Sequence, residues 1–265
     1  MKYLPYLLLL VPAAASANPK KLPYSYGTQT MHEGGLELEN YVDLVPMRVF
    51  REKDDGTLEG VWSTRYQLQT EMEYGLTDRV ELGAYLVWRQ GASANTPFLR
   101  FQGIKQRARV RVSDPTWPVG VAVYGEIAEL YNEVELEEKV LVSWHDGPLE
   151  LVANLWIEQE YYFADSVWEH IYNPTVGASW ELSPSATVGL EYWARGRFDN
   201  PEMSTTEDDA ETGAKTRHYA GPTLSVQRGE YWMSVGAYLR VDTADIAIGD
   251  PYGRFWGRLI IGIGL

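Results

Sequence analysis

The chain has 265 residues and a formal net charge of -14, and its aromatic residues are mainly Trp (10) and Tyr (18), with Phe at only 6. It contains no cysteine, which excludes disulfide cross-links, cysteine-ligated metal centres and a cysteine nucleophile. The acidic balance argues against nucleic acid as a partner, and the lack of any run of about eighteen apolar residues excludes a membrane-spanning helix.

The beginning of the chain has the three regions of a secretory signal peptide. A positive Met-Lys pair is followed by an apolar run at 3–11 and by a small-residue cleavage pattern that ends at Ala17. We therefore predict a signal peptide over residues 1–17 that is cleaved near Ala17. Residues 18–34 are then expected to form a periplasmic N-terminal segment of the exported protein.

From residue 35 onward, apolar and polar residues alternate with a period of two, which is typical of amphipathic β-strands. In residues 62–74 one face reads Trp, Thr, Tyr, Leu, Thr, Met, Tyr, and the other reads Ser, Arg, Gln, Gln, Glu, Glu. The same pattern predicts about twelve strands. Their expected ranges are 35–50, 60–75, 79–91, 98–112, 119–131, 134–144, 149–163, 172–182, 187–198, 217–227, 231–242 and 253–265.

Short turns alternate along the chain with mostly longer, more polar loops, at about 51–59, 92–97, 164–171, 199–216 and 243–252. An even number of strands with short turns on one side and long loops on the other is the layout of an outer-membrane barrel. We therefore predict an all-β fold, a transmembrane antiparallel up-and-down β-barrel over residues 35–265. Its short turns would be periplasmic and its longer loops extracellular.

The competing all-β fold is a soluble periplasmic sandwich, whose apolar faces would pack into a core. Strands of nearly membrane-crossing length are long for a sandwich. The sequence also ends at Leu265 within an apolar strand, as expected for a barrel whose last strand closes onto its first. Both observations favour the membrane barrel.

Three short stretches resemble known proteins. Residues 73–83, Glu-Tyr-Gly-Leu-Thr-Asp-Arg-Val-Glu-Leu-Gly, resemble the strand–turn–strand element of uncharacterised Gram-negative outer-membrane β-barrel proteins described as transporters or porins. Residues 221–225 and 257–265 are similar to the same group. The resemblance implies the bacterial outer membrane as the location and a barrel as the fold, but no substrate. Such barrels usually end in Phe or Trp, whereas this chain ends in Leu265.

Charged residues on the polar strand faces are expected to line the barrel lumen. The predicted lumen-lining residues are Glu37, Glu39, Glu71, Glu73, Glu81, Glu126, Glu158, Glu160, Glu191, Arg65, Arg89, Arg107, Arg109, Arg195, Arg240, Arg254 and Arg258. Because isolated buried charges are very costly, they must pair.

The predicted order of the strands says which of these charges are neighbours. Closing the last strand onto the first would place Arg254 and Arg258 beside Glu37 and Glu39. The second, third and fourth strands would bring Glu71, Glu73 and Glu81 close to Arg107 and Arg109.

The sequence leaves two interpretations of this interior open. The charges can neutralise one another in a filled, non-conducting structural or adhesion barrel, or they can line a wet channel that selects small polar solutes. Twelve strands lie between packed eight-strand and open sixteen-strand barrels. Our leading hypothesis is a small porin-like or transporter-like channel for passive diffusion. Its expected partners are outer-membrane lipid and lipopolysaccharide, the barrel assembly machinery and small polar solutes.

A third hypothesis is a lipid-modifying enzyme with His170 or His218 at the outer rim. The other histidines, His32 and His145, fall on the periplasmic side, and no spacing resembles a nucleophile motif. The acidic run at 207–211 lacks the spacing of a calcium loop and is expected to be solvated. We therefore predict no catalytic residue, no metal site and no cofactor, and a protein that is not an enzyme.

Amphipathic aromatic side chains favour the two membrane interfaces, which accounts for part of the Trp and Tyr excess. By alternation, outward-facing aromatics that suit these interfaces are Trp62, Tyr74, Trp88, Trp144 and Trp180. Four others, Trp156, Trp193, Trp232 and Trp256, fall on the inner face. Aromatic filling of the lumen is therefore the second expected use of these residues.

Overall fold

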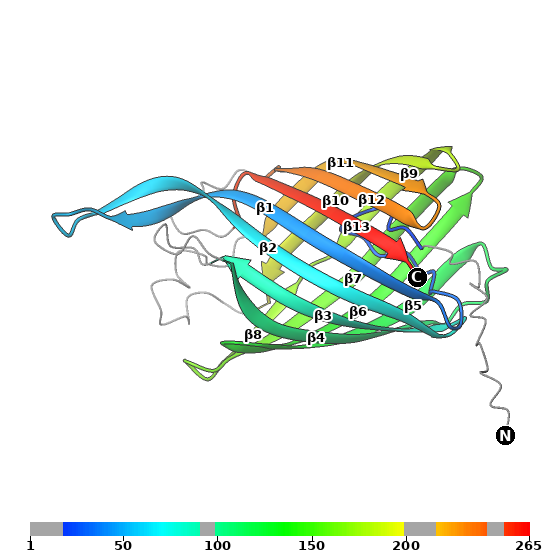
Figure 1. Ribbon diagram of the computed structural model, residues 1–265, viewed down its shortest axis with the longest axis horizontal. Coiled ribbons are helices and arrows are strands. Elements are labelled where there is room, and N and C mark those ends of the chain that lie inside the picture. Colours follow the sequence, from blue (N-terminus) through cyan, green and yellow to red (C-terminus); the bar gives the residue numbers. More distant parts are fainter. Residues whose placement is uncertain (1–17, 91–98, 199–215, 243–251) are drawn as a thin grey trace, which may run out of the picture.

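The computed structural model describes residues 18–90, 99–198, 216–242 and 252–265. The strands are β1 (Leu36–Glu52), β2 (Leu58–Thr77), β3 (Val80–Gln90), β4 (Leu99–Arg111), β5 (Val119–Leu130), β6 (Glu133–Asp146), β7 (Leu149–Tyr162), β8 (Val167–Tyr172), β9 (Thr175–Ser183), β10 (Ala186–Arg197), β11 (Arg217–Arg228), β12 (Tyr231–Arg240) and β13 (Phe255–Gly264). They form one antiparallel sheet that closes on itself, because the first strand, β1, pairs with the last, β13, as well as with β2 (Figure 1). The predicted all-β, up-and-down barrel is confirmed.

Some sequence predictions fall on residues that the structure does not describe. These are the signal peptide at 1–17, the loop at 92–97, the acidic run at 207–211, and almost all of the loops at 199–216 and 243–252. Within the described residues, no helix has the length and apolarity needed to cross a bilayer.

The thirteen strand segments occupy twelve positions in the barrel wall. Strands β8 and β9 share one position, since both pair with β7 and with β10, and they are separated only by Asn173 and Pro174. The predicted loop at 164–171 is therefore largely wrong. Glu169 lies on the inner face of β8, where it forms an ion pair with Arg197 at 2.9 Å.

The two ends of the barrel differ. The hairpins β2–β3, β4–β5, β6–β7, β9–β10 and β11–β12 turn within a few residues at the end where β1 begins and the chain ends (Figure 1). We call this the short-turn end, and it is the end predicted to be periplasmic. At the opposite end, the long β1–β2 hairpin continues its pairing out to Glu52 and Leu58 and projects beyond the wall.

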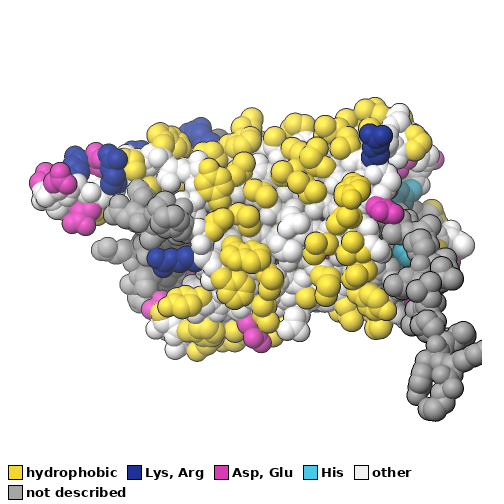
Figure 2. Space-filling view, viewed as in Figure 1, with side chains coloured by type: hydrophobic (Ala, Val, Ile, Leu, Met, Phe, Trp, Pro, Cys, Tyr) yellow, Lys and Arg dark blue, Asp and Glu magenta, His cyan; other side chains and the backbone are white. Residues whose placement is uncertain are grey.

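The outer surface of the wall is apolar. Along β2, Met72 and Tyr74 are exposed, whereas the alternating Glu71 and Glu73 are buried on the inside. Figure 2 shows hydrophobic side chains over the middle of the surface in view, and charged side chains gathered mainly toward the ends, above all on the β1–β2 hairpin. A soluble protein has apolar side chains inside and charged side chains outside. The opposite distribution here is expected of a wall that faces lipid.

A charge placed on this outer wall should be costly. Leu155 lies at the middle of β7 and is 58% exposed, so Leu155→Arg is expected to lower the free energy of unfolding by about 2–4 kcal/mol. The matched control is Leu58→Arg, because Leu58 is 64% exposed but lies at the tip of the projecting hairpin, where the loss should be about 0–1 kcal/mol. Urea unfolding in phospholipid vesicles measures both, and equal losses would contradict a lipid-facing wall at Leu155.

Candidate functional site in the barrel lumen

The structure places nearly all of the predicted lumen charges inside the wall. Each predicted glutamate is buried, as are Arg107 and Arg109. Arg65, Arg89, Arg195, Arg240 and Arg258 are half-buried on the inner face. The exception is Arg254, which is exposed and precedes β13. A role of these residues in solute passage stays a prediction.

The predicted interface aromatics lie on outward faces. Trp62, Tyr74 and Trp180 are exposed, while Trp88 and Trp144 are partly covered, Trp88 by an edge-on contact with Phe101 at 5.9 Å between ring centroids. Their contact with membrane interfaces stays a prediction. The four inner tryptophans, Trp156, Trp193, Trp232 and Trp256, are buried.

The first charge cluster centres on Arg107 of β4. Its guanidinium contacts Glu71 at 2.6 Å and Glu81 at 2.6 Å, and it also contacts Glu73. Arg109 extends the cluster by pairing with Glu81 at 2.7 Å. The order of strands β2, β3 and β4 thus brings together the acidic and basic residues that it was predicted to bring together.

The predicted pairing at the barrel seam is wrong. Arg258 lies opposite Asp43 in the β1–β13 register and binds it at 2.7 and 2.8 Å, whereas Glu37 and Glu39 lie opposite Gly264 and Gly262. Alternation indicates which face a residue occupies, but it carries no information about register between distant strands. The prediction therefore had the correct face for Arg258 and the wrong partner.

A second cluster lies between β4, β5 and β6. Lys105 pairs with Glu126 at 3.0 Å, Glu135 at 3.1 Å and Glu137 at 3.4 Å. Lys139 pairs with Glu137 at 2.9 Å and lies over the Trp156 ring, 3.6 Å from its centroid.

The N-terminal residues 18–33, which we call the plug, occupy a position that the sequence did not predict. This segment lies inside the wall near the short-turn end (Figure 1). Its backbone hydrogen-bonds to the wall at Glu191 through Ser25 N, and at Asn154 through both Tyr26 N (2.7 Å) and Tyr26 O (2.8 Å). Further along, Met31 N donates to Glu81 at 2.8 Å. Because these partners lie on β3, β7 and β10, the segment crosses the lumen.

Lys20 is the main charge that the plug contributes. Its ammonium contacts Glu39, Glu71 at 3.2 Å and Glu73 at 2.9 Å, which are three carboxylates grouped closely enough to hold a cation. Burial alone would lower the pKa of Lys20, but these carboxylates raise it well above its usual value. The ammonium of the plug therefore neutralises part of an acidic wall.

Aromatic stacking holds the middle of the plug. The Tyr24 ring stacks on Trp193 at 4.3 Å, and Trp193 stacks on Tyr219 at 4.1 Å. The guanidinium of Arg258 lies 4.2 Å from the centroid of the Tyr24 ring. Stacked aromatics and cation–π contacts of this kind are favourable in a desolvated interior.

The wall is shaped to receive the plug. A Cβ at Gly177 would lie 2.7 Å from Cδ1 of Leu22, and a Cβ at Gly189 would lie 2.9 Å from Cδ2 of the same side chain. Larger residues at these two positions would displace Leu22. Two inward glycines, diagonal to each other on β9 and β10, were therefore a signal in the sequence that something packs against the inner wall there.

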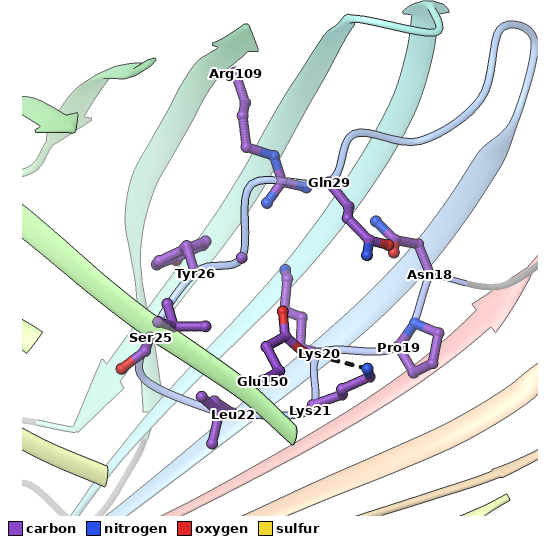
Figure 3. Close-up of a pocket in the computed structure, with 12 residues that line it drawn as sticks. Asn18, Pro19, Lys20, Lys21, Leu22, Ser25, Tyr26, Gln29, Arg109 and Glu150 are labelled. Carbon is purple, nitrogen blue, oxygen red and sulfur yellow. Dashed lines mark ion pairs between the residues drawn. The ribbon is translucent and has the colours of Figure 1, made fainter. Parts of the chain in front are cut away.

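Within the described part of the chain, a small pocket and a larger cavity adjoin the plug. A small pocket of about 60 Å³ is enclosed by residues 18–29 and bordered by Arg109 and Glu150, with the Lys21–Glu150 ion pair across it (Figure 3). On the long-loop side of Tyr24 lies a larger space of about 270 Å³, which we call the upper cavity. The lumen is thus partly filled and partly open, between the two interpretations that the sequence left open.

The candidate enzyme histidines occupy the wall. His218 of β11 accepts or donates a hydrogen bond with Tyr192 Oη at 2.6 Å through Nδ1, and its backbone N donates to Asp242 at 3.1 Å. His170 lies in β8 opposite Gln159. The described contacts of the His218 ring are with Tyr192 and include no serine hydroxyl, so they add no support to the third hypothesis of a lipid-modifying enzyme.

The fold resembles those of several solved outer-membrane proteins. An outer membrane channel from Pseudomonas putida F1 matches with a TM-score of 0.63 at 10% identity, over 90% of this chain and 98% of that one. The NanC porin matches with a TM-score of 0.56 at 7% identity, over 87% and 98% of the chains. The KdgM porin, solved in complex with disordered oligogalacturonate, matches with a TM-score of 0.54 at 8% identity, over 86% and 97%.

No protein-family model matches the chain, and no curated protein matches it in sequence. The similarity at these low identities therefore concerns the fold. The chain has the closed β-barrel fold of outer-membrane porins and channels, as the resemblance of its strand–turn–strand elements implied.

Proposed function

We propose that the protein is a small outer-membrane channel for passive diffusion of polar solutes, with the plug restricting its lumen. The observation that carries this proposal is the polar seating of the plug. Lys20 and the backbone of residues 24–31 bind the wall through hydrogen bonds and ion pairs, beside an upper cavity of about 270 Å³. Water can replace such hydrogen bonds and ion pairs when the plug moves, whereas it cannot replace the contacts of a close-packed apolar core.

Two further points support the proposal. The outer wall is apolar while the inner wall is charged, which is the distribution expected of a water-filled passage through lipid. The solved proteins of similar fold include channels and porins. Export by the signal peptide at 1–17, insertion by the barrel assembly machinery and contact with lipopolysaccharide belong to the same proposal.

The test is conductance in planar bilayers. The folded protein is expected to give discrete current steps, and Tyr24→Ala should increase the time spent open, because it removes the stack on Trp193 and the contact with Arg258. If the free energy that holds the plug in the lumen falls by about 1–2 kcal/mol, the open fraction rises by about 5–30-fold.

The control is Tyr131→Ala, since Tyr131 is 86% exposed between β5 and β6 and does not contact the plug. Current steps from Tyr131→Ala should equal those of the unmodified protein. Complete absence of steps from both the unmodified protein and Tyr24→Ala, with both folded, would favour the non-conducting structural barrel.

A further inference from the structure

The upper cavity has the size and lining of a binding site. Its volume of about 270 Å³ is close to the ~300 Å³ at which small-ligand pockets begin. Tyr24 of the plug forms part of its lining, and wall residues of β2, β3, β6, β7 and β13 form most of the rest. It therefore lies inside the barrel on the side of the plug that faces the long loops.

Most cations of this cavity are already neutralised by neighbouring carboxylates. Arg195 binds Glu158 at 2.5 Å and Glu160 at 2.8 Å. Arg258 binds Asp43 at 2.7 Å, and Lys105 contacts three glutamates, as described above. These three cations are neutralised by carboxylates of the wall and need no ligand for this.

Arg65 is different. Among the described residues it forms no ion pair, and its guanidinium lies over the Trp256 ring, 5.5 Å from the centroid. Its Nε atom is buried and has no hydrogen-bond partner. A guanidinium held in a lumen without a carboxylate is costly, because charge-assisted hydrogen bonds are what normally stabilise it there.

Arg89 adds a second guanidinium beside it. In the β2–β3 register Arg89 lies opposite Gln67, so it is diagonal to Arg65 on the inner face. Its carboxylate contact among the described residues is with Glu133 at 3.7 Å, and its own Nε is also buried without a partner. Two adjacent guanidiniums with free N–H groups form a site that a carboxylate would complete.

Two further residues of the lining carry unsatisfied polar atoms. Trp156 and Asn173 line the cavity, and Trp156 Nε1, which can only donate, and Asn173 Oδ1, which can only accept, are buried without hydrogen-bond partners. A ligand that satisfies both must carry a donor and an acceptor. Hydroxyl groups supply both, whereas an ammonium group can only donate.

The net charge of the lining limits the charge of the ligand. Among the described residues, six carboxylates line the cavity (Asp43, Glu133, Glu135, Glu137, Glu158 and Glu160), against five cations (Arg65, Arg89, Lys105, Arg195 and Arg258). A second negative charge on the ligand would meet this acidic side and be repelled. One carboxylate at the Arg65 side is the arrangement that the lining favours.

We propose that the upper cavity binds a small hydroxylated monocarboxylate, with its carboxylate on Arg65 and Arg89 and its hydroxyls near Trp156 and Asn173. The rings of Tyr24, Trp156 and Trp256 line the same space and offer apolar faces to the carbon skeleton. That this molecule is carried through the barrel rests on the proposed channel function, but its binding does not.

Titration calorimetry on the folded protein in detergent tests the site, with D-glucuronate as the probe. D-glucose has the same ring without a carboxylate, and butyrate has a carboxylate without hydroxyls. Glucuronate is expected to bind about tenfold more tightly than either. Arg65→Gln should weaken glucuronate binding by about tenfold, and Arg65→Lys by less, because lysine keeps the charge but loses the planar fork.

The matched control is Arg51→Gln, which removes the same charge from the projecting hairpin, where Arg51 pairs with Glu59. It should bind glucuronate as the unmodified protein does. Trp156→Phe removes the unpartnered indole N–H and keeps an aromatic ring, so it should weaken glucuronate binding by about threefold. This second variant keeps the proposal testable should Arg65→Gln fail to fold.

Equal affinity for glucose and glucuronate would overturn the carboxylate site, and equal affinity for butyrate and glucuronate would overturn the role of the hydroxyls. Unchanged glucuronate binding in folded Arg65→Gln would remove Arg65 from the site. Conductance is measured separately, so binding without current would reject the channel and keep the site. Current without glucuronate binding would reject the site and keep the channel.

Discussion

Oxidation of a Thr28→Cys/Ser143→Cys variant is expected to close the channel, and reduction is expected to reopen it. Thr28 of the plug and Ser143 of β6 are joined by a hydrogen bond between their hydroxyl groups, so cysteines at these positions would face each other across the plug–wall contact. Because the chain has no cysteine of its own, the engineered pair is the sole source of a disulfide. The bond would hold the plug in the lumen.

The measurement is bilayer conductance before and after addition of a reducing agent. We expect the oxidised variant to conduct at most about a tenth as often as the reduced one, since a covalent link adds about 2–4 kcal/mol against release of the plug. Each single-cysteine variant serves as a control and should not respond to reduction. Equal conductance of the oxidised and reduced double variant would show that solutes pass while the plug remains seated.

Arg107→Ala is expected to cause the largest loss of stability among single changes inside the lumen. Arg107 is buried and contacts Glu71, Glu73 and Glu81, so its removal leaves several buried carboxylates without their shared cation. Breaking a buried ion pair by removing one partner costs about 3–5 kcal/mol. Urea unfolding of the reconstituted protein would measure this loss in the free energy of unfolding.

The control for this change is Arg51→Ala in the projecting hairpin, where an exposed ion pair with Glu59 is worth about 0–1 kcal/mol. Adding Glu81→Gln to Arg107→Ala should recover part of the stability, because one uncompensated charge disappears. A loss from Arg107→Ala no greater than that from Arg51→Ala would mean that water entering the lumen already solvates these carboxylates.

The barrel could be predicted from the sequence because its strands have two faces in different solvents. Each residue on a strand is assigned to the inside or outside by parity alone, which is why Glu71 and Met72 were separated correctly. One prediction failed at 164–171, where most of β8 was interpreted as a loop. The strand is short and follows a polar turn, so the whole segment has the composition of a loop.

Partners inside the lumen were harder to predict than faces. Neighbouring strands in a hairpin fix Arg107 beside Glu81, but the closing register that pairs Arg258 with Asp43 depends on strands more than two hundred residues apart. The plug was missed because residues 18–33 have no periodicity and bind side chains scattered over β3, β6, β7 and β10. The inward pair Gly177 and Gly189 was the available signal.

The plug also has a consequence for the order of assembly. Its anchoring partners Ser143, Asn154 and Glu191 are separated from it in sequence by 115, 128 and 166 residues. Contacts over such separations form late, since the entropy of closing each long loop must first be overcome. The earliest described part of the chain to be synthesised therefore completes its contacts only after the wall that surrounds it exists.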